Sequence, residues 1–168
     1  VARSPATDYS QGLAITSIFR ADPVTTIEPV RSPRGSSAMR LLGGPMLESG
    51  GFLSRVGQSL AEIARRPRDF ARTHLRPGWA ERTTILLAMQ WEDNRLRLRP
   101  GRSILTGFRN DLVSWPDGDK TIPTKIGIGH EVTRRFAAQT DGVPMGSINE
   151  GLFDVPMTAH ILGGCPIG

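Results

Sequence analysis

The residues best suited to chemistry lie close together near the C-terminal end of the sequence, where His160 is followed by two consecutive glycines and a cysteine. Glycine adds no side chain to a packed core, but it lets a backbone approach a large flat ligand closely and adopt positive φ without steric cost. A neutral imidazole is well suited to accept a proton near neutral pH. These residues predict a ligand site with His160 as proton acceptor. The alternative is a core histidine before a glycine-rich turn.

A second candidate is Glu28, a carboxylate between an isoleucine and a proline. It lies in the run 25–30, whose β-branched residues predict a strand. A carboxylate is an unusual choice if this strand simply faces a core, so Glu28 is a candidate base. The alternative is an exposed glutamate paired with Arg31.

The composition argues against several classes of function. The formal net charge of +5 comes almost entirely from arginine, but the arginines are dispersed and only 6% of the residues are aromatic, which disfavours nucleic acid as a partner. The three histidines and the single cysteine lack the spacing of a metal motif, so no metal site is predicted. No apolar run approaches the roughly 18 residues that span a bilayer, which favours a cytoplasmic or peripheral membrane-associated location over an integral membrane one.

One basic segment raises the question of a membrane surface. Five arginines between positions 65 and 76 are interleaved with Phe70, Leu75 and Trp79. Such a segment can lie on an anionic membrane. The alternative is a helix packed on the sheet with an ordinary solvated basic face.

The periodicity predicts an α+β fold, a mainly antiparallel sheet with flanking helices. Ser54 is expected to cap a helix that ends before Pro67, and the segment 126–139 to form a second helix. His74 and His130 are expected at the surface or at an interface. The strands are predicted at 13–19, 25–30, 83–91 in a hairpin with 95–99, 104–115, and 148–155.

The segment Thr-Ala-His-Ile-Leu-Gly-Gly-Cys, residues 158–165, resembles the His-Pro-Leu-Gly-Gly-Cys motif of the cholesterol oxidase branch of the glucose–methanol–choline (GMC) flavoenzymes. It departs from that motif at Ile161, where many members have proline. The resemblance implies that His160 hydrogen-bonds the substrate hydroxyl and helps to remove its proton beside the flavin. Gly163, Gly164 and Cys165 would then lie against the flavin, with Cys165 a packing residue rather than a reactive thiol.

The similarity to this family runs nearly end to end, through 8–17, 26–31, 81–90 and 141–144. It implies a substrate-binding domain over residues 1–155, with 156–168 starting the return into an incomplete FAD-binding domain. A strand of this kind carries a glutamate base in steroid oxidases, which supports Glu28, although a family pattern of Glu-Ile-Ala-Pro would place the carboxylate at Thr26. No Gly-x-Gly-x-x-Gly is present, so we expect the chain to be a piece of a longer protein and inactive by itself.

The reaction implied by the resemblance is oxidation of the 3β-hydroxyl of a sterol by bound FAD, with hydride passing to flavin N5. Oxygen or a carrier would then accept the electrons. Two alternatives stay open at this point. The chain could belong to another GMC alcohol dehydrogenase that acts on a non-steroid substrate, or it could be a non-enzymatic lipid-binding module.

Overall fold

The chain divides into two compact units, Val1–Gln90 with Thr124–Gly168, and Trp91–Pro123. Each is described by itself below. The computed structural model describes residues 2–3, 8–47, 50–92, 96–103, 107–117 and 122–155.

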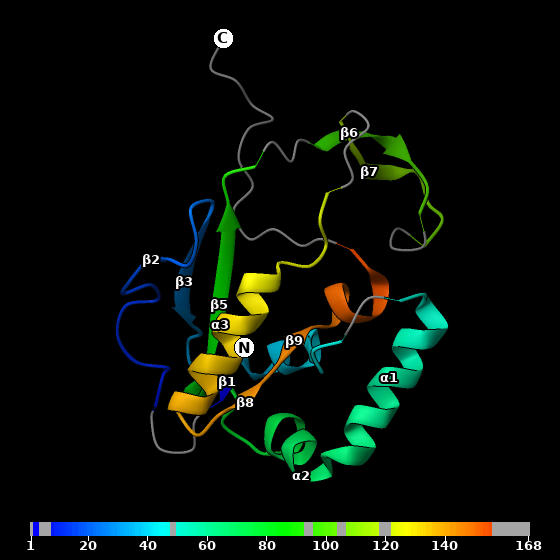
Figure 1. Cartoon of the computed structure of the whole chain (residues 1–168). Coiled ribbons are helices and arrows are strands. Elements are labelled where there is room, and N and C mark those ends of the chain that lie inside the picture. The colour runs from blue at the N-terminus through cyan, green and yellow to red at the C-terminus, as the bar shows by residue number, and fades with distance from the viewer. Residues whose placement is uncertain are drawn as a thin grey trace. The chain divides into compact units, whose positions relative to one another are not determined.

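A five-stranded sheet forms the centre of the first unit (Figure 1). The strands predicted at 25–30 and 83–91 become its central pair, β3 (Thr25–Arg31) and β5 (Thr83–Gln90), which pair antiparallel with Glu28 opposite Leu87. The strand order is β2-β3-β5-β1-β8, and each adjacent pair is antiparallel. The prediction of an α+β fold with a mainly antiparallel sheet is therefore confirmed. The shorter strands are β1 (Ala2–Arg3), β2 (Phe19–Arg20) and β8 (Val143–Pro144).

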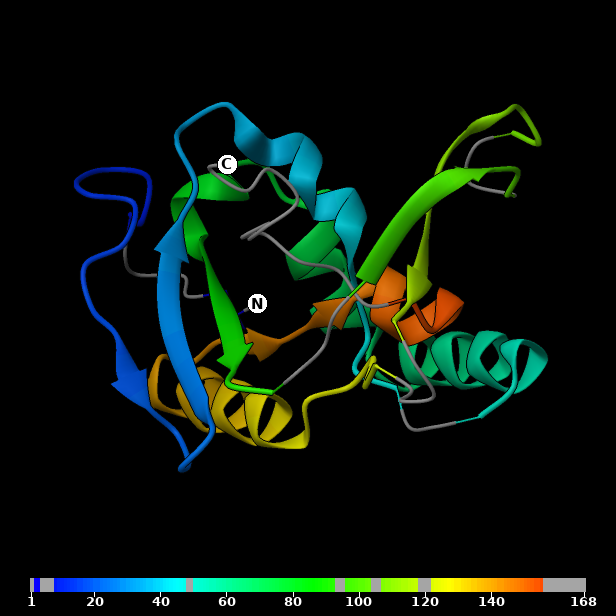
Figure 2. The same cartoon turned by 90° about the horizontal axis from the view of Figure 1, so that it is seen from above.

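One face of this sheet is covered by α3 (Gly127–Gln139), the helix predicted from the 126–139 pattern (Figures 1 and 2). Gly129 allows the close approach, because a Cβ added there would lie 3.4 Å from the Cβ of Ala88 on β5. Arg134 and Arg135 are exposed, as the helical spacing predicts. The opposite side of β3 and β5 consequently does not face α3.

The predicted hairpin between 83–91 and 95–99 is wrong. In the second unit, β6 (Leu96–Gly101) pairs with β7 (Asp111–Pro116) in a two-stranded sheet of its own. Strict alternation in the sequence marks a strand but does not identify its partner. Here the cross-strand pairing of Arg97 with Trp115, and the guanidinium of Arg99 lying 4.7 Å over the Trp115 ring, favour β7.

A long helix, α1 (Phe52–Arg65), lies in the first unit and ends before Pro67 as predicted. The predicted cap at Ser54 is wrong, because the N-cap is Gly51 and no side chain caps the helix. Leu60 is 64% exposed, whereas Arg55 and Ser59 are the buried residues of the helix.

The remaining elements are short. The predicted strand over 148–155 is wrong, because β9 (Gly146–Ser147) ends before it and a π-helical turn, η4 (Asn149–Phe153), takes its place. The apolar residues Ile148 and Leu152 are four apart, which suits a helical turn as well as a strand. The others are η1 (Ser36–Leu42), β4 (Gly43–Gly44) paired with β9, α2 (Pro67–Phe70), η2 (Ala71–Leu75) and η3 (Ala80–Arg82).

Within the described ranges, the buried interior is unusually rich in hydroxyl side chains. Six apolar residues and eight polar or charged ones are buried. Thr73 and Thr133 satisfy their hydroxyls by donating to carbonyls one helical turn earlier, at 2.9 Å and 2.7 Å. The apolar members are Ile27, Leu47, Trp79, Ala80, Ala137 and Met145.

The basic segment is divided between surface and interior. Arg65 and Arg66 are exposed, and both lie near Glu62. Trp79 is only 1% exposed, so it is a core residue and is not available to a membrane. His74 is not a simple surface residue either, because it stacks on Phe70 with ring centroids 4.5 Å apart. Among the residues the structure describes, none of the helices is both long and apolar enough to cross a bilayer.

Candidate functional site

Glu28 lies in the middle of β3, the strand that the sequence predicted for it. Residues two apart on a strand share a face, so Glu28 lies on the same face as Thr26 and Val30. The uncertainty of register between Thr26 and Glu28 therefore does not change the face on which a carboxylate would be presented.

This face is the one that does not pack on α3. Ile27, next to Glu28, is fully buried and pairs with Ala88, the residue that Gly129 of α3 approaches. Glu28 itself pairs with Leu87 and points to the other side. We call that side the Glu28 face. It comprises the half-buried residues Thr26, Glu28, Val30, Ile85, Leu87 and Met89.

The Glu28 face offers one carboxylate among mostly apolar neighbours. Glu28 does not pair with Arg31, which was the alternative to a role as a base. Arg31 lies on the opposite face, and its Nη1 donates to the carbonyl of Gln11 at 2.8 Å. A carboxylate on an apolar surface can accept a proton or a hydrogen bond from one polar group of a largely apolar ligand.

The other predicted site residues lie outside the described residues. These are His160, which the sequence suggests as the proton acceptor, and the three that follow it, Gly163, Gly164 and Cys165. Their roles stay predictions. The last described residues before them in the sequence are Asp154 and Val155, which follow η4.

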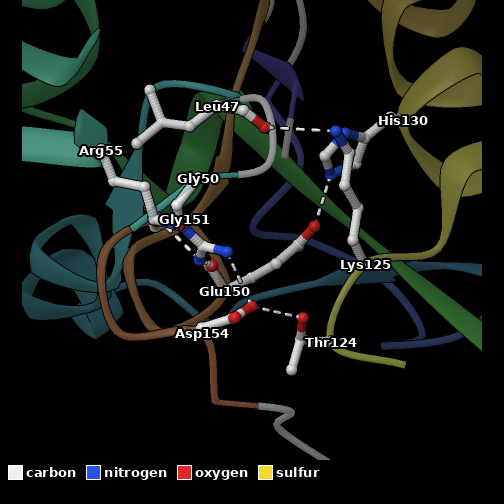
Figure 3. Close-up of polar contacts among 9 residues, drawn as sticks. All are labelled: Leu47, Gly50, Arg55, Thr124, Lys125, His130, Glu150, Gly151 and Asp154. Atoms are coloured by element: carbon white, nitrogen blue, oxygen red, sulfur yellow. Dashed lines mark hydrogen bonds and ion pairs between the residues drawn. The ribbon is translucent and has the colours of Figure 1, made fainter. Parts of the chain in front are cut away.

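A cleft of about 290 Å³ lies beside η4, in the first unit. Its walls come from the loop after β4, from α1, from the start of α3 and from β9 with η4 (Figure 3). The sequence patterns did not indicate this cleft, because its polar residues come from three stretches that are far apart in the sequence, at 55, 124–130 and 147–154. The polar or charged lining side chains are Arg55, Thr124, Lys125, His130, Ser147, Glu150 and Asp154.

Arg55 is the most connected side chain of this cleft and is 7% exposed. Its Nε donates to the carbonyl of Gly50 at 2.6 Å. Its Nη1 donates to the carbonyls of Glu150 and Gly151 at 3.0 and 3.3 Å, and its Nη2 lies 2.9 Å from Asp154 Oδ1. One guanidinium thus joins the loop before α1 to the middle and the C-terminal end of η4.

On the other wall, His130 of α3 meets Glu150 of η4. His130 Nε2 lies 2.7 Å from Glu150 Oε1, within ion-pair distance, although the approach is outside the directions that a hydrogen bond requires. The His130 side chain is 12% exposed, so the prediction of a surface position is wrong, whereas a place at an interface stays a prediction. Lys125 Nζ donates to the carbonyl of Leu47 at 3.3 Å.

Asp154 holds an unusual backbone conformation at the end of η4. Its φ of 55° and ψ of 39° are left-handed, which costs a non-glycine residue about 1 kcal/mol or more. Its Oδ1 accepts a hydrogen bond from Thr124 Oγ1 at 2.6 Å and lies beside Arg55. The Thr124 hydroxyl, and then the Arg55 guanidinium, hold the pKa of the Asp154 carboxyl below its usual value, although partial burial acts in the opposite direction.

This lowered pKa makes the contacts of η4 sensitive to acid. The pKa of Asp154 is lower in the folded than in the unfolded protein, so its ionised carboxylate stabilises the folded state. This stabilisation is complete above about pH 3.9 and is lost as the pH falls through the folded pKa. We expect Asp154→Asn to accelerate amide exchange of residues 149–155 near about pH 6, and the difference from wild type to shrink towards about pH 3. Hydrogen exchange followed by mass spectrometry, as a ratio to wild type at each pH, measures this.

Asp141→Asn is the matched control, because Asp141 also has a left-handed backbone, with φ of 47°. It follows α3 and has no contact with Arg55 among the described interactions, so its ratio in 149–155 should stay near one. A constant effect of Asp154→Asn across the pH range would contradict the expectation.

The chain was compared with known proteins. It is 41% identical over 169 residues to a protein named cholesterol oxidase from two strains of Mycobacterium tuberculosis, an alignment that covers 98% of this chain and 29% of the relative. It is 35% identical over 160 residues to a cholesterol oxidase from Acinetobacter baumannii, covering 95% of this chain and 28% of that protein. The chain therefore spans less than a third of the length of these relatives.

Two other comparisons found nothing. No protein-family model matches the chain. No solved structure matches it.

Proposed function

We propose that this chain is the substrate-binding region of an FAD-dependent alcohol oxidoreductase of the GMC family, and that the whole enzyme oxidises the 3β-hydroxyl of a sterol. The observation that carries the proposal is the similarity of nearly the entire chain to proteins named cholesterol oxidase in two distant bacterial genera. Residues 1–155 would form the substrate-binding domain. Residues 156–168 would start the return into the FAD-binding domain.

The Glu28 face supports this proposal independently of the similarity. A sterol is a large apolar molecule with one hydroxyl, so its site needs apolar area and few polar groups. Val30, Ile85, Leu87 and Met89 supply apolar area around one carboxylate. Glu28 would act there as a second base, most directly in shifting the ring double bond of the ketone product.

His160 would take the hydroxyl proton of the substrate in this reaction. Gly163, Gly164 and Cys165 would contact the cofactor, because two adjacent glycines leave the backbone open to a flat ring system. Bound FAD would supply the hydride acceptor, with oxygen or a carrier as the final electron acceptor. Contact with an anionic membrane through the exposed arginines near Arg65 is a proposal of the same kind.

The test uses the complete protein encoded by the gene that contains this chain. Anaerobic addition of cholesterol should bleach the flavin absorbance near about 450 nm. A flavin spectrum that cholesterol does not bleach would keep the flavoenzyme and reject the sterol, leaving a non-steroid alcohol as substrate. A protein without flavin would reject the proposal as a whole.

Glu28→Gln tests the second base. Glutamine keeps the shape and hydrogen-bonding capacity of the side chain but cannot take up the proton, so we expect the double-bond shift to slow by about 10²-fold, the lower end of the range for a positioned base. The unshifted ketone should accumulate, which chromatography of the products measures. Glu131→Gln, at a glutamate of α3 whose side chain is 51% exposed, is the matched control. An unchanged product ratio would contradict the role.

A further inference from the structure

We propose that Arg55 is a positioning residue, which fixes the turn formed by η4 and Asp154 and thereby the direction in which the chain continues to His160. The inference rests on the proposed function only for the role of His160. The clamp itself consists entirely of described residues in one unit (Figure 3).

The turn needs such a clamp because its local conformation is not self-supporting. η4 is a single π-helical turn of five residues, a form that is rare and short in proteins. It ends on Asp154 with a left-handed backbone, and strained residues of this kind persist only where their surroundings over-determine them. Inside the turn, the amides of Asp154 and Val155 both donate to the carbonyl of Asn149.

Arg55 provides the missing constraint from a stable element. It lies in the first turn of the 14-residue helix α1, so its Cα is fixed independently of η4. Its donors meet the carbonyls of Glu150 and Gly151 inside the turn and the carboxylate of Asp154 at its end. Thr124 donates to the same Asp154 oxygen from a third segment.

The geometry requires arginine rather than any cation. A guanidinium presents five N–H donors in one rigid plane, whereas an ammonium is a compact charge with three donors. Here those donors reach four acceptors, Gly50, Glu150, Gly151 and Asp154. Lysine could keep the ion pair with Asp154 but could not bind all three carbonyls as well.

The clamp matters for catalysis because of where it acts. Asp154 lies six residues before His160, and six residues span at most about 20 Å even when fully extended. Because this connection is short, we expect a change in the place and direction of the turn at Asp154 to displace the imidazole of His160. Misplacing a catalytic group by about 1 Å can cost about 10²-fold in rate.

The experiment compares Arg55→Lys and Arg55→Met with wild type in the complete protein. Arg135→Met is the matched control, because Arg135 is also a helical arginine, on α3, but its side chain is 77% exposed. Three quantities are measured: amide exchange of residues 149–155, kcat and KM for cholesterol, and the visible flavin spectrum. Exchange reports on the clamp whether or not the enzyme acts on sterols.

For Arg55→Met we expect about tenfold faster exchange of residues 149–155, because charge-assisted hydrogen bonds to the turn are lost. We expect kcat to fall by about 10–10²-fold while KM changes little, since the apolar contacts of the substrate are elsewhere. Arg55→Lys should recover part of both effects. Arg135→Met should match wild type.

The outcomes separate this inference from the proposed function. If Arg55→Met and Arg55→Lys both exchange like wild type in 149–155, the clamp is overturned. If exchange rises but kcat is unchanged in an active enzyme, positioning of His160 is overturned. If the wild type does not oxidise sterols, the proposed function fails, and faster exchange in both variants still supports the clamp. Should Arg55→Met not fold, Arg55→Lys decides by the same criteria.

Discussion

Replacing His160 by alanine in the complete protein is expected to lower the turnover of a 3β-hydroxysteroid by about 10²–10⁴-fold, the usual contribution of a positioned general base. The imidazole is the only side chain of the terminal motif that can accept a proton near neutral pH, so alanine leaves the hydroxyl proton without a protein acceptor there. Steady-state oxidation of cholesterol, with kcat and KM determined separately, measures the effect.

The loss should be confined to the chemical step. The variant should retain bound flavin, so the visible spectrum serves as the control for folding and cofactor content. His160→Gln, which restores a hydrogen-bonding group but no proton acceptor, should recover binding more than turnover. A rate equal to wild type for His160→Ala would remove this histidine from the mechanism and leave the motif as a glycine-rich turn.

Trp79→Ala is expected to destabilise the first unit by about 3–5 kcal/mol, the range for removing a fully buried aromatic side chain. Trp79 is 1% exposed and is the largest of the fully buried side chains in the described part of the protein. The alanine would leave a cavity that the surrounding close-packed side chains can fill only in part. Exchange of the amides of β5 at increasing urea concentration measures the loss.

Two further tryptophan variants make this prediction specific. Trp91→Ala is the matched control, because Trp91 is 80% exposed and should change stability by less than about 0.5 kcal/mol. Trp79→Phe should cost much less than alanine, since the indole Nε1 has no hydrogen-bond partner among the described residues. Equal losses for Trp79→Ala and Trp91→Ala would show that Trp79 is not part of the core.

The elements that the sequence predicts correctly are those with strong local patterns. The continuous apolar run of β5 and the helical spacing of α3 each carry the information for their own structure. Pairing is different, since any alternating strand can accept several partners. The neighbour of β6 is decided by contacts with Trp115, about twenty residues further along the chain, and no local pattern reports on it.

The sequence likewise predicts some residues of the candidate site and not others. Glu28 could be found because an acidic residue interrupts an apolar strand, and its face follows from the period of two. Arg55 could not, because a single arginine in a helix is normally read as solvated and its four acceptors are distant in sequence or are backbone carbonyls. Only the folded chain brings Gly50, Gly151 and Asp154 around it.

The hydroxyl-rich interior of the described residues has a thermal consequence. The heat capacity change of unfolding rises with exposed apolar area and falls with exposed polar area. A buried set in which Thr25, Thr83 and Thr84 take places that aliphatic side chains usually fill therefore gives a small heat capacity change for its size. The free energy of unfolding of this region should therefore change little with temperature, and its curve against temperature should have a broad maximum.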